Sequence, residues 1–241
     1  MWDGCEIGSR LAAGSHWLDV GCGSGALSEA ILQEAAPSRV KGIDPSDGYL
    51  TQVQKRIRDK RAHFEVGDAQ TLPDNAASYD AVVSGLVLNF IPQPARAVGE
   101  MMRVAKSEGV VAAYVWDYAG KMQLMRHLGN AAAALDPQAI DLDEGRRFPL
   151  CQPKPLAKLF QSVGLKDVAV RASDISTDFK DFDDYWSPFL GGQGSAPSYA
   201  MSLSEDRRAA LRERLCAGLP FALAGSMPLV ARAWGVYGVR P

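Results

Sequence analysis

Three aspartates in the first part of the chain follow short apolar segments, where a carboxylate could bind a ligand. They are Asp19, Asp44 and Asp68. Asp19 precedes a turn in which glycine occupies every second position, at Gly21, Gly23 and Gly25. An apolar run, a glycine turn and an alanine-rich helical pattern together predict a corner that binds a nucleotide.

The negative charge of Asp19 limits which nucleotide the glycine turn could bind. The pattern Gly21-x-Gly23-x-x-Ala26 also satisfies the dinucleotide fingerprint, in which backbone N–H groups and a helix N-terminus bind a pyrophosphate. A carboxylate beside the turn would repel a pyrophosphate and attract a cation. S-adenosylmethionine fits better, because it has no phosphate and carries a sulfonium and a protonated amino group.

The other two aspartates are placed for the rest of such a cofactor. Asp44 ends a second predicted strand, where an acidic residue accepts both ribose hydroxyls in nucleotide-binding folds. Asp68 ends a third predicted strand and is positioned to accept a hydrogen bond from the adenine amino group. Ala69 follows Asp68 and offers its backbone N–H.

The elements that position these residues alternate along the chain. Hydrophobic patterns predict strands at 16–20, 39–44, 62–66, 79–84, 110–116, 166–172 and 229–239. Helices are predicted at 24–35, 46–60, 92–106, 120–135, 155–163, 182–190 and 204–217, and a mobile glycine-rich loop at 191–198. The alternation predicts an α/β fold with a doubly wound, mostly parallel sheet. Ligands of such sheets lie beyond the carboxyl ends of the strands.

Four motifs follow one another at regular intervals: LDVGCGSG at 18–25, GIDPS at 42–46, GDAQTLP at 67–73 and YDAVVS at 79–84. With these motifs the chain resembles the class I S-adenosylmethionine-dependent methyltransferases, and in particular the small-molecule group that includes the quinone-biosynthesis C-methyltransferases. The resemblance implies a Rossmann-like sheet of seven strands, the last of them antiparallel. S-adenosylmethionine would be the cofactor and S-adenosylhomocysteine the product.

The resemblance also implies a role for each cofactor-binding residue. The methionine part would be surrounded by the glycine turn, namely Asp19, Gly21, Cys22, Gly23 and Gly25. The ribose would be held by Asp44 and Pro45, and the adenine by Asp68 and Ala69. Ser84 or Gly85 would lie beside the sulfonium.

The domain organisation follows from the same resemblance. We expect one methyltransferase domain over 1–241, with the cofactor-binding core at 16–118 and two insertions, at about 119–152 and 174–226, that form a helical cap. Two features depart from the family. Residues 106–109 read KSEG where relatives have Pro-Gly-Gly, and only about fifteen residues precede the first strand, where relatives carry a helix that covers the cofactor.

The acceptor pocket is expected at the end of the fifth strand, at Trp116, Asp117 and Tyr118. Trp186, with Tyr185 and Phe189, could line a lid over this pocket; the alternative is that these aromatic residues pack a helix against the sheet. The three histidines stand alone, and no His–Asp pair or metal-ligand spacing is evident. We therefore name no catalytic base and expect no metal.

Composition limits the partners. The formal net charge is −2, which gives no electrostatic footprint for nucleic acid or for an anionic membrane. The fourth strand lacks the Asn/Asp-Pro-Pro-Tyr of enzymes that methylate exocyclic or amide nitrogens. No apolar stretch is long enough to span a membrane, and no signal peptide is evident. Four scattered cysteines fit a reducing compartment, so we expect a cytoplasmic protein, its oligomeric state left open.

Three hypotheses about function result. The first is methyl transfer from S-adenosylmethionine to a small or medium-sized, partly apolar metabolite by in-line displacement. The second is a non-catalytic protein that binds the same cofactor. The third is an NAD-dependent oxidoreductase, which the dinucleotide fingerprint would allow.

Overall fold

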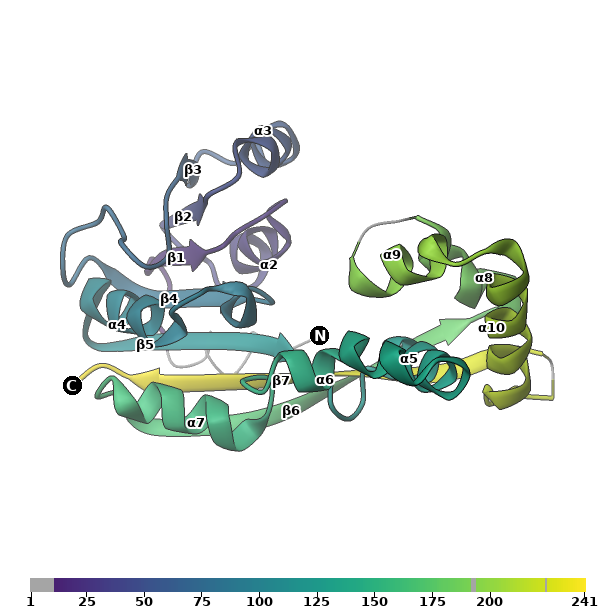
Figure 1. The fold of residues 1–241 in the computed structure, drawn as a ribbon. Helices are drawn as coiled ribbons and strands as arrows, with labels where there is room; N and C mark the ends of the chain where they lie inside the picture. Colours follow the sequence, from purple (N-terminus) through teal and green to yellow (C-terminus); the bar gives the residue numbers. More distant parts are fainter. Residues whose placement is uncertain (1–10, 192–193, 224) are drawn as a thin grey trace. The chain divides into compact units, whose positions relative to one another are not determined.

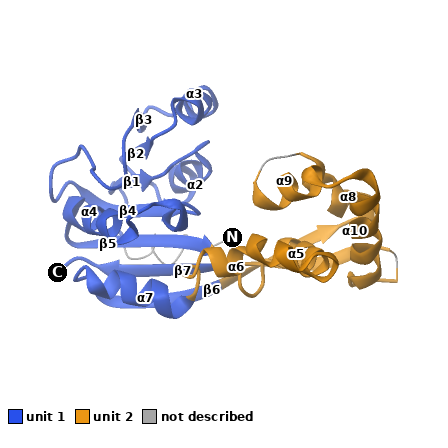
Figure 2. Cartoon of the chain, in the orientation of Figure 1, with its two compact units in different colours: residues 1–115, 153–172, 234–241 blue, residues 116–152, 173–233 orange. Residues whose placement is uncertain are grey.

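The structure is a computed structural model that describes residues 11–191, 194–223 and 225–241 (Figure 1). The chain forms two compact units (Figure 2): residues 1–115, 153–172 and 234–241 make the first, and residues 116–152 and 173–233 make the second. Cys5, the chain start and residues 192–193 of the predicted glycine-rich loop lie outside the described residues.

Seven strands form one sheet in the order β3-β2-β1-β4-β5-β7-β6, and β6 and β7 include residues of both units. Their bounds are β1 (His16–Val20), β2 (Arg39–Asp44), β3 (Ala62–Val66), β4 (Tyr79–Gly85), β5 (Ala105–Trp116), β6 (Lys166–Phe179) and β7 (Met227–Val239). Strands β1 to β5 pair in parallel. Central strands such as β1 and β4 are buried almost throughout, which explains why their sequences read as continuous apolar runs.

Helices connect these strands, as the alternating pattern predicts. They are α2 (Ala26–Glu34), α3 (Asp47–Arg56), the short η1 (Leu88–Phe90), α4 (Pro94–Val104) and α7 (Pro153–Ser162). The side chain of Ser46 caps α3 by accepting a hydrogen bond from the backbone N–H of Tyr49. Pro94 begins α4, where a missing N–H costs nothing.

The sheet is mixed rather than purely parallel. The backbone N–H groups of Glu108 and Arg240 donate to the carbonyls of Arg240 and Gly109, and the N–H of Asp117 donates to the carbonyl of Arg232. Residue numbers that increase along β5 are therefore paired with residue numbers that decrease toward the start of β7. The last strand thus runs antiparallel to β5, as Figure 1 shows. The seven-stranded Rossmann-like fold is confirmed, and its parallel character is limited to part of the sheet.

The fifth strand begins earlier than predicted, at Ala105 instead of residue 110. The pairing of β4 with β5 shifts register between Tyr79 and Ala81, and Glu108 has a positive φ of 61°. A bulge therefore accommodates residues 106–109 inside the strand, where Glu108 and Gly109 form backbone hydrogen bonds with Arg240, the residue after β7.

The second unit is mostly helical and has a core of its own. Its elements are α5 (Gln123–Leu135), η2 (Pro137–Leu142), α6 (Glu144–Arg147), α8 (Phe182–Trp186), η3 (Ser187–Leu190), α9 (Ser195–Ser202) and α10 (Glu205–Gly218). The core gathers residues such as Leu128, Tyr185 and Leu211. Helix α9 corrects part of the predicted loop at 191–198, where the pattern Ser195-Ala196-Pro197-Ser198 begins a helix instead.

Two findings concern the described residues as a whole. Every helix in the described ranges is too short or too polar to cross a membrane. Within the same ranges, no three side chains of the metal-binding types gather closely enough to hold a metal ion.

Candidate functional site

The predicted cofactor residues of the first unit lie together because their strands end at one edge of the sheet. Asp19 pairs with Gly42 of β2 and with Val83 of β4, so β1, β2 and β4 are in register near their carboxyl ends. Asp44 pairs with Val66, which places the end of β3 beside the end of β2. The loops after these four strands therefore share one edge.

The glycine turn between β1 and α2 needs its glycines for two reasons. Gly21, Gly23 and Gly25 all have positive φ values, of 75°, 51° and 88°. A Cβ on Gly21 would lie 2.6 Å from Val87, and a Cβ on Gly25 would lie 2.3 Å from Val53. A Cβ on Gly23 would meet no atom within 4 Å, so the space beside Gly23 is open to a ligand.

Asp44 links the end of β2 to the glycine turn. One carboxylate oxygen accepts a hydrogen bond from the backbone N–H of Gly23 at 2.9 Å, and the other accepts one from Ser46 at 2.9 Å. The side chain is buried, and each oxygen keeps a lone pair for a further donor. Such a carboxylate can accept hydrogen bonds from two neighbouring hydroxyls. Pro45, which follows it, is exposed.

Asp19 has a buried carboxylate that is only half satisfied. Its Oδ2 accepts a hydrogen bond from the Ser28 hydroxyl at 2.7 Å, whereas its Oδ1 has no partner. Burial raises the pKa of Asp19 to about 7, and repulsion from Asp44 adds to this, while the Ser28 hydrogen bond opposes it. A buried carboxylate oxygen without a partner fits a cationic group of a ligand.

Cys22 contributes its backbone rather than its thiol. The N–H groups of Gly21 and Cys22 both donate to the carbonyl of Ile43, at 2.7 and 3.0 Å. The Cys22 side chain packs in a small core with Leu50, Val53 and Phe64, and burial raises the pKa of the thiol. The thiol therefore stays protonated and inert in this core.

Asp68 and Ala69 lie in the loop that follows β3. The Asp68 carboxylate is exposed and accepts a hydrogen bond from the backbone N–H of Gln70 at 2.8 Å. The preceding Gly67 donates to the carbonyl of Asp44 at 3.2 Å, and a Cβ there would lie 2.5 Å from Ile43. The start of this loop is thus bound closely to the end of β2.

Ser84 and Gly85 end β4 beside a residue that the sequence analysis missed. The Ser84 hydroxyl is buried and has no partner. A Cβ on Gly85 would lie 2.6 Å from the Tyr114 hydroxyl, so only glycine leaves room for that ring. Burial raises the pKa of Tyr114 to about 12, and the Asp19 carboxylate adds to the rise. A tyrosine within the apolar run 110–115 is the signal that could have identified it.

Leu86, directly after β4, has a φ of 60°, which is strained for a side chain of its size. Its backbone N–H donates to the carbonyl of Tyr114 at 2.8 Å, and this hydrogen bond holds the strained residue in place. Strained backbone at the end of a central strand is typical of functional sites.

The residues predicted for the acceptor, Trp116, Asp117, Tyr118 and Trp186, all belong to the second unit. The Asp117 carboxylate accepts hydrogen bonds from the backbone N–H groups of Gly120 and Lys121, both at 3.0 Å, and so closes a turn. Trp186 lies in the core, with its ring against Phe182 and Phe189. Trp116 is half-buried.

Tyr118 lines a cavity of about 270 Å³ within the second unit. Its walls come mainly from α5, η2 and α9 and are largely apolar. The polar part contains the ion pair of Arg126 with Asp143, at 2.9 Å, and Glu144, which accepts a hydrogen bond from Ser195. Such a cavity suits a small molecule with an apolar body and a few polar groups.

Comparison with known proteins assigns the family. The methyltransferase domain family matches residues 18–113. A demethylmenaquinone methyltransferase from Roseiflexus sp. (strain RS-1) is 30% identical over 169 residues, which cover 64% of this chain and 69% of that protein.

Solved structures share the fold. A candidate methyltransferase from Bacillus halodurans C-125 has a TM-score of 0.64 at 14% identity, and the match covers 98% of this chain and 96% of that one. Phosphoethanolamine N-methyltransferase 2 from Haemonchus contortus, solved with S-adenosyl-L-methionine, has a TM-score of 0.61 at 16% identity, covering 98% of this chain and 51% of that one.

The fold, the glycine turn and these matches define a class: the chain belongs to the class I S-adenosylmethionine-dependent methyltransferases. It is an enzyme that transfers a methyl group, and S-adenosylmethionine is its cofactor. The family, enzyme class and cofactor predicted from the four motifs are confirmed. The roles of individual residues stay predictions.

Proposed function

We propose that this enzyme methylates a small or medium-sized, partly apolar metabolite by in-line displacement. The observation that carries the cofactor half of the proposal is the unpartnered Oδ1 of the buried Asp19. In this reading it faces the cationic amino group of the methionine part, while Asp44 accepts the ribose hydroxyls and Asp68 and Ala69 bind the adenine.

Bound S-adenosylmethionine supplies a methyl group that its sulfonium has already activated. The chain then has to hold the acceptor in line and exclude water. The Ser84 hydroxyl and the Gly85 backbone stand at the end of β4, where the proposal places the reacting centre. Leu86 holds the backbone there in a fixed conformation.

For the acceptor half we propose that the second unit serves as the cap and that its cavity holds the acceptor. Support comes from the predominantly apolar walls and from Tyr118, which the sequence already indicated. The similarity to a demethylmenaquinone methyltransferase supports a partly apolar acceptor as well.

Calorimetry and a turnover assay test the proposal. Asp44→Ala should weaken binding of S-adenosylhomocysteine by about 1–3 kcal/mol, because ribose hydroxyls lose their acceptor. The matched control is Asp47→Ala, which removes an exposed carboxylate at the start of α3. This variant should bind S-adenosylhomocysteine as tightly as the wild type does. NAD, added as a second ligand, should not bind.

Transfer of a labelled methyl group to a panel of partly apolar metabolites then identifies the acceptor. Unchanged affinity in Asp44→Ala would remove Asp44 from the site. Cofactor binding without transfer to any member of the panel would favour the hypothesis of a non-catalytic binding protein.

A further inference from the structure

Helix α4 carries three charged residues on one face, and each of them contacts the loop between β3 and β4. We call Arg96, Glu100 and Arg103 the α4 stripe. Spacings of four and three residues place them on the same side of a helix. The loop is the one that begins with Asp68 and Ala69.

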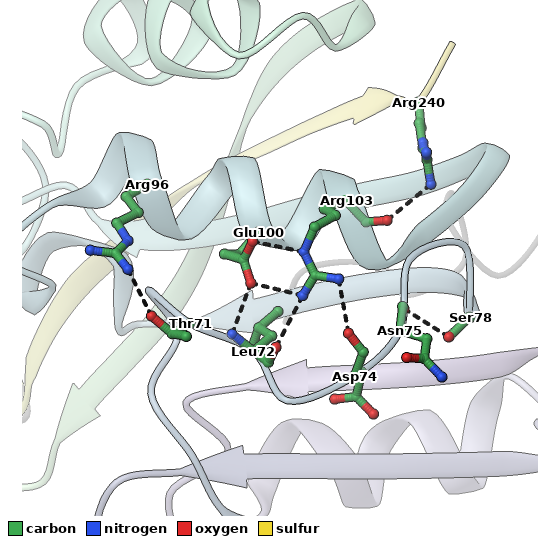
Figure 3. Close-up of polar contacts among 9 residues, drawn as sticks. All are labelled: Thr71, Leu72, Asp74, Asn75, Ser78, Arg96, Glu100, Arg103 and Arg240. Atoms are coloured by element: carbon green, nitrogen blue, oxygen red, sulfur yellow. Dashed lines mark hydrogen bonds and ion pairs between the residues drawn. The ribbon is translucent and has the colours of Figure 1, made fainter.

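The contacts run along the loop in chain order (Figure 3). Arg96 donates to the Thr71 hydroxyl at 2.9 Å, and Glu100 accepts from the backbone N–H of Leu72 at 2.9 Å. Arg103 donates to the carbonyls of Leu72 and Asp74, at 3.0 and 2.9 Å. Backbone groups of the loop are thus bound by side chains of the helix.

Two further features stiffen this arrangement. Arg103 and Glu100 form a bidentate pair at 2.8 Å, which lowers the pKa of Glu100 and keeps its carboxylate charged. Just before α4, the backbone N–H of Gln93 donates to the side-chain oxygen of Gln70. Gln70 in turn donates to the Asp68 carboxylate from both its side-chain amide nitrogen and its backbone N–H. The residue before α4 therefore reaches the Asp68 carboxylate through Gln70, while α4 itself binds the loop from Thr71 to Asp74.

We propose that the α4 stripe positions Asp68 and Ala69 for adenine and thereby determines the specificity of the enzyme for an adenine-containing cofactor. The proposal rests on the adenine role given to Asp68 above. Arg103 and Glu100 are positioning residues, because they act through the loop and do not contact the base.

Arg103→Lys and Glu100→Gln test the proposal, with Thr71→Val as a milder, exposed variant. Arg103→Lys keeps the charge, but its single nitrogen has three donors and cannot replace the four hydrogen bonds that the planar guanidinium makes to Glu100, Leu72 and Asp74. Calorimetry compares two probes. One is S-adenosylhomocysteine, and the other is its analogue in which unsubstituted purine, without the 6-amino group, replaces adenine. We expect the variants to bind S-adenosylhomocysteine about tenfold more weakly and the purine analogue almost unchanged.

Arg61→Lys is the matched control. Arg61 binds the Asp59 carboxylate at 2.7 Å and the carbonyls of Leu32 and Pro37, so it anchors a different loop of the first unit in the same way. A merely structural role would lower the melting temperature of both lysine variants and leave the preference for adenine intact. The proposal requires the preference for adenine to fall in Arg103→Lys and to stay at its wild-type level in Arg61→Lys.

Hydrogen exchange and kinetics provide the second readout. Residues 68–74 should exchange faster in Arg103→Lys than in the wild type, and KM for S-adenosylmethionine should rise with little change in kcat. A wild-type preference for adenine in Arg103→Lys, Glu100→Gln and Thr71→Val would overturn the inference. In that case Asp68→Asn decides how far the failure extends. If this variant also kept the preference for adenine, the adenine role proposed for Asp68 would be wrong as well. If it lost the preference, only the role of the α4 stripe would be wrong.

Discussion

At the residue scale, Asp19 is the residue on which the proposed cofactor site depends most. A carboxylate is costly to bury, and only one oxygen of this one is hydrogen-bonded, to Ser28. Because the pKa of Asp19 is about 7, this carboxyl group is partly protonated near neutral pH when no ligand is bound. A cationic ligand group would replace that proton.

Asp19 should also make stability depend on pH. Its folded pKa of about 7 lies above the ordinary 3.8, so the native state binds a proton that the unfolded chain has released. The free energy of unfolding of the cofactor-free protein should therefore fall as pH rises from about 4 to 7, by up to about 4 kcal/mol from this residue. Asp19→Asn should remove that slope.

Urea denaturation of both proteins at about pH 5 and pH 8 measures the effect, with the exposed Asp47→Asn as the control. The variant should gain stability relative to the wild type at the higher pH and bind S-adenosylhomocysteine more weakly there. Parallel pH profiles of wild type and Asp19→Asn would contradict the assignment.

At the scale of elements, the turn between β1 and α2 is fixed by neighbours far away in sequence. Gly21 faces Val87 and Gly25 faces Val53, whereas Gly23 faces open space. Gly21 and Gly25 thus allow close packing against Val87, the residue before η1, and against Val53 of α3. Gly23 leaves room for a ligand.

Gly25→Ala and Gly23→Ala should therefore fail in different ways. Gly25→Ala combines a positive φ with a clash against Val53 and should lower the free energy of unfolding by about 2–4 kcal/mol. Gly23→Ala has only the backbone strain, about 1–2 kcal/mol, but should weaken cofactor binding. Denaturation and calorimetry on both variants separate these effects, and equal losses of stability would argue against the distinction.

At the scale of the whole molecule, the chain forms two units with separate cores. The residues proposed to bind the cofactor belong to the first unit, and the cavity proposed for the acceptor lies within the second. Substitutions in the cavity should therefore change the acceptor's KM without changing cofactor affinity.

Gly129→Leu is suited to this test, because Gly129 lines the cavity on α5 and a Cβ there meets no atom within 4 Å. Leucine also favours a helix over glycine by about 0.5–1 kcal/mol, so the variant should fold. Once an acceptor is known, its KM should rise at least about tenfold as the cavity fills. Unchanged KM would place the acceptor elsewhere, and S-adenosylhomocysteine affinity serves as the internal control.

How much the sequence could predict depended on how local each feature is. The strands at 16–20, 39–44 and 62–66 were predicted correctly. Each is marked by an apolar run followed within a few residues by a glycine or an aspartate, so that neighbouring residues suffice to predict it. The bulge at 106–109 and helix α9 were not predicted, because hydrogen bonds to the distant Arg240 and packing in the second core override the local turn preference.

The sequence by itself determined the family, the cofactor and the succession along the chain of the strands near whose ends Asp19, Asp44 and Asp68 lie. Only the tertiary structure decided which atoms are left without partners, such as Asp19 Oδ1 and the Ser84 hydroxyl. It alone decided that Tyr114 lies against Gly85 and that Arg103 holds a loop some thirty residues earlier in the chain. The physical reason is that burial and hydrogen bonding depend on packing between distant segments, which local patterns do not record.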